Sequence, residues 1–185
     1  MRYLIFPLCF LTACAHSGHK NAHPLQSLCG KSFQGNVVSQ DPQDADWRKE
    51  TLVLGPVHCS QSHNHFEMPL AVGENKSRTW IITQHKSSLE LRHQHLLDDG
   101  SIDPVSDYGG FSSKNFHTSV FSPEENWQAD FPADTKTIEI FKTNGLTQSI
   151  RNIWSLKISP DKTLTYELNR EGRHFRAEFD LANPL

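Results

Sequence analysis

The stretch TLTYELNREGRHFRAEFD, residues 163–180, decides the fold of this chain. Apolar and polar residues alternate on both sides of a turn at residues 169–172, and the apolar ones are Leu164, Tyr166, Leu168, Phe175, Ala177 and Phe179. Side chains at every second position of a strand share one face. The stretch therefore predicts a hairpin with one apolar and one polar face.

Similar alternation extends upstream from this hairpin. Trp154, Leu156 and Ile158 alternate up to a turn at residues 159–162, which predicts a three-stranded meander. Further strands are expected at residues 32–39, 51–58, 65–72, 78–85, 89–96 and 137–141, with one helical turn at residues 42–49. Residues 98–132 are rich in Gly, Ser, Asp and Asn, and we expect a long functional or covering loop that contains a short strand or turn.

About nine short strands with polar outer faces predict an all-β fold. Both an antiparallel β-barrel of the lipocalin-like kind and a β-sandwich fit this pattern. We favour the barrel because closure removes exposed strand edges. The formal net charge of −3 argues against nucleic-acid binding.

The first residues have the pattern of an export signal. Arg2 precedes an apolar run at residues 3–11, which has the length of a signal-peptide core. This run is too short to cross a bilayer, which takes about 20 apolar residues. It ends in the sequence LTAC at residues 11–14, which resembles the bacterial lipobox. The resemblance implies cleavage after residue 13 and attachment of acyl chains such as palmitate to Cys14, whereas the alternative is an ordinary secretory signal with an incidental cysteine.

A lipid on Cys14 would fix the rest of the domain organisation. Residues 14–27 would be a lipid-anchored flexible linker, and residues 28–185 a single β domain. No aspartate follows the cysteine, so we expect the periplasmic leaflet of the bacterial outer membrane. Cys29 and Cys59 would then be the two cysteines left in an oxidising compartment, which predicts a disulfide. A two-cysteine metal site and free thiols are the alternatives.

The most informative stretch for chemistry is HQHLLDDGSIDPVSDYGG, residues 93–110. On a strand from residue 89, His93 and His95 share the apolar face, and Asp99, Asp103 and Tyr108 follow. Three interpretations stay open: structural histidines hydrogen-bonded to those residues, contacts to a ligand, or a metal site. Two histidines with a carboxylate can hold a divalent ion such as zinc, which could generate hydroxide from water.

Two further groups of residues could contribute to a site. His63 and His65 form a second pair, which would strengthen the metal interpretation if it met the first pair in space. Arg170 shares the inward face of its strand and needs a carboxylate, either a protein partner such as Asp134 or Asp180 or an anionic ligand. Arg78, Arg173 and Arg176 complete this arginine group. The sequence contains no nucleophile elbow, phosphate-binding loop or zincin helix.

The stretch HQHLLDDG followed by YGG resembles an uncharacterised family of bacterial secreted proteins whose members carry a pattern like HDHRHEDG followed by YGG. Here Leu97 stands where that pattern has its third histidine, which weakens a three-histidine metal site. SRTW at 77–80, FPAD at 131–134, NIW at 152–154 and FRAEFDL at 175–181 extend the resemblance over most of the domain. It implies no activity.

These observations lead to three hypotheses for function. The first is a membrane-anchored periplasmic lipoprotein whose barrel binds a small ligand or serves as an envelope accessory protein, with a polar site drawn from His93, His95, Asp99, Asp103, Tyr108 and Arg170. The second is a metal-dependent enzyme that uses His93 and His95. The third is a purely structural envelope protein. We favour the first, a binding protein over an enzyme.

Overall fold

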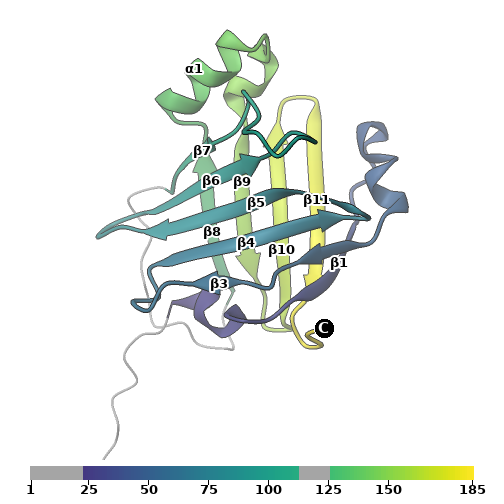
Figure 1. Ribbon diagram of the computed structural model, residues 1–185, viewed down its shortest axis with the longest axis vertical. Coiled ribbons are helices and arrows are strands. Elements are labelled where there is room, and N and C mark those ends of the chain that lie inside the picture. The colour runs from purple at the N-terminus through teal and green to yellow at the C-terminus, as the bar shows by residue number, and fades with distance from the viewer. Residues whose placement is uncertain (1–22, 113–125) are drawn as a thin grey trace, which may run out of the picture.

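The computed structural model describes residues 23–112 and 126–185 (Figure 1). These residues form one antiparallel sheet of eleven strands, which curves into a nearly closed barrel. The strands are β1 (Phe33–Val37), β2 (Leu52–Leu54), β3 (His58–Cys59), β4 (His65–Val72), β5 (Asn75–Gln84), β6 (Leu89–His95), β7 (Tyr108–Phe111), β8 (Trp127–Pro132), β9 (Ile153–Ile158), β10 (Thr163–Arg170) and β11 (Arg173–Asp180). The helices are α1 (Thr135–Thr143) and the short 3-10 helices η1 (Pro24–Leu28), η2 (Pro42–Asp44), η3 (Trp47–Lys49) and η4 (Thr147–Arg151). No helix of this described part is long and apolar enough to span a membrane.

Strands that follow one another in the chain are mostly neighbours in the sheet. The order is β7-β6-β5-β4-β2-β1-β11-β10-β9-β8, and β3 pairs with β4 outside this path. β1 pairs with β11, where Gly35 lies opposite Phe179, and so joins the two halves of the chain. The predicted all-β barrel is confirmed, and so is the predicted C-terminal meander of β9, β10 and β11.

The core lies inside the barrel because alternate side chains of each strand point inward. β1 and β8 both alternate strictly between buried and exposed positions. The largest fully buried side chains are Trp154, Phe33, Phe66, Phe131 and Phe179. Aromatic side chains of this size contribute strongly to a core, at about 25 cal/mol for each Å² of apolar surface removed from water.

The barrel closes at a seam between β7 and β8, the two ends of the strand order. Gly109 and Gly110 of β7 allow close approach there: a Cβ on Gly110 would lie 1.9 Å from the Pro132 carbonyl oxygen. Thr137 of α1 clamps the same strand, since its hydroxyl donates to the Gly109 carbonyl at 2.7 Å and accepts from the Gly109 amide at 2.7 Å. The amide of Asp134 also donates to the Gly109 carbonyl at 3.2 Å. The two glycines of the Tyr-Gly-Gly sequence therefore allow the barrel to close at this seam.

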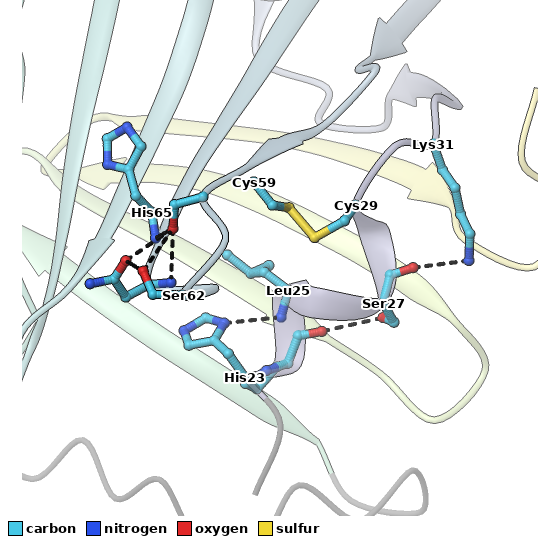
Figure 2. The surroundings of a disulfide bond; sticks show 11 residues. His23, Leu25, Ser27, Cys29, Lys31, Cys59, Ser62 and His65 are labelled. Atoms are coloured by element: carbon cyan, nitrogen blue, oxygen red, sulfur yellow. Dashed lines mark hydrogen bonds between the residues drawn. A yellow bond between two sulfur atoms is a disulfide. The ribbon is translucent and has the colours of Figure 1, made fainter. Parts of the chain in front are cut away.

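One end of the barrel is closed by η1, which carries the fully buried Leu25. The predicted disulfide is present: Cys29 at the end of η1 is bonded to Cys59 of β3, and it ties the plug to the wall (Figure 2). His23 is buried as well, and its Nδ1 accepts from the Leu25 amide at 3.1 Å. Residues 23–27 thus belong to the packed domain, so the expected linker boundary at residue 27 was placed too far along the chain.

Two further expectations are corrected by the structure. Residues 137–141 lie in helix α1 and not in a strand, because Asp134 caps the helix by accepting from the Thr137 amide at 2.9 Å. The expected loop at 98–132 contains β7 and β8, while residues 113–125 of it lie outside the described residues. The expected signal peptide and Cys14 also lie outside them.

Candidate functional site

A cavity of about 360 Å³ occupies the end of the barrel opposite η1, since its lining includes Leu70 of β4 whereas the N-cap residue of η1, His23, contacts Phe66 near the start of that strand. Its inner wall is apolar and its mouth is polar. The lining residues used below are Trp47, Arg78, Trp80, His93, His95, Val105, Tyr108, Tyr166 and Arg173.

The strand register orders this lining by depth. Arg78 pairs with His95, and Trp80 pairs with His93 two residues further along both strands. Ile82 and Leu91 form the next pair and are fully buried. Along these two strands the lining therefore changes from charged at the mouth to aromatic one step deeper, and the buried aliphatic pair of the core lies below it.

His93 is the centre of the aromatic layer. Its ring stacks on Tyr108, with centroids 4.6 Å apart, and Trp80 stacks on Tyr166 at 4.2 Å. The Nδ1 of His93 lies 3.2 Å from the Tyr108 carbonyl oxygen, and Nε2 lies 2.7 Å from the Tyr166 hydroxyl. A carbonyl oxygen can only accept, so Nδ1 carries the hydrogen and Nε2 accepts from Tyr166.

Burial keeps His93 neutral. Desolvation lowers its pKa to about 3, and it raises the pKa of Tyr108 to about 12. Both ring nitrogens of His93 are occupied by groups of the protein itself. The structure thus gives His93 the predicted structural role, although its partners are the tyrosines and not Asp99 or Asp103.

His95 and Asp103 lie together at the mouth. The Nδ1 of His95 is 2.8 Å from the Asp103 carboxylate, whose other oxygen accepts from the Val105 amide at 2.7 Å. Asp103 thereby positions both a cavity histidine and the loop that carries Val105. Asp99 is not part of the cavity: it borders an outer groove and accepts from the Ser101 amide and hydroxyl.

Arg173 is the inward arginine with carboxylate partners, a role that the sequence suggested for Arg170. It forms ion pairs with Asp41 at 2.9 Å and with Asp44, which is 2% exposed. These pairs fasten the η2–η3 segment to the β10–β11 hairpin. Burial of Asp44 beside a guanidinium is favourable only while that partner is present.

Arg170 and Arg176 lie elsewhere. Arg170 donates to the amide oxygen of Asn152 at 3.1 Å and borders a different hollow, so neither Asp134 nor Asp180 is its partner. Asp134 instead pairs with Arg92 of β6, and this bond reaches across the seam. Arg176 pairs with Glu178 at 2.6 Å.

The described residues do not support the zinc interpretation. Within residues 23–112 and 126–185, no three His, Cys, Asp or Glu side chains form a group that could hold a metal ion. On β5, Thr83 pairs with His65 and Arg78 pairs with His95. These two positions are five residues apart, so His65 and His95 are separated by about 16 Å along the strand direction. The side chain of His65 contacts the Thr83 hydroxyl at 3.0 Å, on the face opposite to the cavity. His63 lies in the turn before β4, and the two histidine pairs do not meet.

The residue that sequence reasoning undervalued is Arg78. The sequence placed it in an arginine group without assigning it a role, whereas the structure places it beside the cavity with its guanidinium 5.0 Å from the ring centroid of Trp47. Arg78 lies two residues before Trp80, so the two side chains share one face of the strand, and this spacing is the sequence signal that could have identified it. Comparison of the chain with protein-family models, curated proteins and solved structures found no match.

Proposed function

We propose that this chain is a lipid-anchored envelope protein whose barrel binds a small ligand in the cavity. The observation that carries the proposal is the cavity itself, which is closed by η1 at one end and lined by aromatic and aliphatic side chains below a polar mouth. Its volume of about 360 Å³ is within the range of small-molecule sites, about 300–1,000 Å³. Because protein interiors are otherwise close-packed, a space of this size inside the barrel supports a binding role.

The anchor and the cavity are compatible in space. Eight residues separate Cys14 from His23, so the acyl chains would lie within about 30 Å of η1. η1 lies at one end of the barrel (Figure 1), where its N-cap residue His23 contacts Phe66 near the start of β4, whereas the cavity is lined by Leu70 near the other end of that strand. An anchored barrel would therefore hold its plugged end towards the bilayer and its mouth towards the aqueous compartment.

Ligand binding is tested with the neutral fluorescent probe N-phenyl-1-naphthylamine. We expect one saturable site per chain, abolished by Val105→Trp, which fills the mouth from the loop. The matched control is Val38→Trp, which adds the same side chain at a position 38% exposed. A Val105→Trp protein that binds the probe as the unaltered protein does, or an unaltered protein that binds none, contradicts the proposal.

The anchor is tested separately by expressing the full chain and Cys14→Ser in a bacterial host. We expect palmitate labelling and membrane fractionation of the unaltered chain, and loss of both in the variant. An unaltered chain found only in the unlabelled periplasmic fraction refutes the lipid anchor and leaves the cavity argument intact.

A further inference from the structure

Arg78 is a half-buried cation without an anionic partner. Its Nη1 donates to the amide oxygen of Asn75 at 2.9 Å and to the Ser77 hydroxyl at 3.3 Å, and both of these groups are neutral. Within the described residues no carboxylate forms an ion pair with Arg78, and its Nε and Nη2 have no hydrogen-bond partner. Desolvation disfavours its charged form and lowers its pKa.

The other ionisable side chains at the mouth already have ionisable partners within the protein. Arg173 is paired with two aspartates, and His95 contacts Asp103. Asp98 and Asp99 border the outer groove beside Arg78, and among the described residues neither forms an ion pair with it; Asp99 accepts hydrogen bonds from Ser101. Arg78 is therefore a cation of the cavity lining that no carboxylate of the described residues pairs with.

The surroundings of Arg78 favour a particular shape of anion. Trp47 lies against the guanidinium, and the Nε and Nη2 edge, which has no partner among the described residues, matches a bidentate carboxylate. Tyr108 lines the same cavity. Immediately below Arg78, Trp80 and Tyr166 are stacked and offer an aromatic wall to an apolar body.

We propose that the cavity selects small ligands with one carboxylate on an apolar, ring-containing body, and that Arg78 binds the carboxylate; this rests on the proposed ligand-binding function. The ring lies against the aromatic layer of Trp80 and Tyr166, and the carboxylate remains at the mouth. A ligand of the same shape without the charge gains the apolar contacts but leaves Arg78 uncompensated.

The test is displacement of bound N-phenyl-1-naphthylamine by two competitors of nearly equal shape, 1-naphthoate and 1-naphthamide, at pH 7.5 in low salt. A charge-assisted hydrogen bond predicts that naphthoate binds at least about tenfold more tightly than naphthamide. We expect Arg78→Gln to abolish this preference and to retain affinity for the neutral competitor. Arg151→Gln is the matched control, because this side chain is 80% exposed and outside the cavity.

The outcomes separate the two proposals. If the probe binds but the two competitors displace it equally from the unaltered protein, the carboxylate selectivity is refuted and ligand binding stands. If the unaltered protein binds no probe, both proposals fail. A preference for naphthoate that persists in Arg78→Gln refutes the assignment to Arg78. If that variant does not fold, displacement of the probe by the two competitors is compared in the unaltered protein and in Arg78→Lys, and this comparison decides the question.

Discussion

Two buried histidines should make the stability of this domain strongly dependent on pH between 7.5 and 5. Burial lowers the pKa of His93 to about 3 and that of His23 to about 4, against an ordinary value of 6.5. Above pH 6.5 both residues are neutral in the folded and unfolded chain, and their contribution is complete. As the pH falls below 6.5 the unfolded chain takes up protons that the folded chain refuses, so stability decreases.

The magnitude follows from the pKa difference. Each pH unit between the folded and unfolded pKa changes the free energy of unfolding by about 1.4 kcal/mol for each group. At pH 5 the loss is therefore about 2 kcal/mol for each histidine, or about 4 kcal/mol for the pair. Carboxylates with lowered pKa, such as Asp134, contribute to acid sensitivity mainly below about pH 4, which is why the comparison stops at pH 5.

Urea unfolding at pH 7.5 and 5.0 measures this effect. His93→Gln keeps a donor for the Tyr108 carbonyl and an acceptor for the Tyr166 hydroxyl, and it should halve the loss between the two pH values. His23→Gln should remove the other half. The double variant should show neither histidine's part of the decrease in the free energy of unfolding between the two pH values. An identical loss in the unaltered protein and His93→Gln would refute the conclusion that His93 is held neutral by burial, whatever the absolute stabilities are.

Three further predictions concern stability and are read from urea unfolding at pH 7.5. Replacing Cys29 and Cys59 by serine should lower the free energy of unfolding by about 3–4 kcal/mol, as a loop closed over a sequence separation of 30 implies, and an unchanged midpoint would contradict this. Gly110→Ala should cost about 2 kcal/mol or more, because its methyl group overlaps a backbone carbonyl across the seam. Arg173→Gln should cost about 3–5 kcal/mol by leaving a buried aspartate without its partner, and Arg170→Gln less than about 1 kcal/mol; equal costs would refute the different roles given to the two arginines.

The strands were predictable because their signal is local. Alternation along residues 163–180 fixed the faces of β10 and β11, and the same rule placed His93 and His95 inward on β6. Helix α1 was mistaken for a strand because β-branched residues dominate its short core, and only Thr137 and Phe141 of the helix are buried. The signal that would have corrected it was Asp134, an N-cap residue three positions before Thr137.

The sequence suggested carboxylate partners for Arg170, whereas Arg173 has them, and local sequence patterns cannot distinguish these two arginines. Arg170 and Arg173 face one another across the β10–β11 pair, so their strand parity is the same. What distinguishes them is the η2–η3 segment, more than 120 residues earlier in the chain, which brings Asp41 and Asp44 to Arg173 and not to Arg170. A contact of this sequence separation has no signature within either segment.

The stretches that suggested a family resemblance acquire two different physical roles in the fold. Gly109 and Gly110, with Asp134 of the FPAD stretch, close the barrel at the seam, where only glycine permits the backbone approach. Arg78 of the SRTW stretch meets His95 at the mouth of the cavity. A glycine at the seam acts on stability and not on ligand preference, whereas Arg78 carries charge that the fold leaves uncompensated. Replacements of the seam residues should therefore change stability, and only replacements at the mouth should change which ligands the barrel prefers.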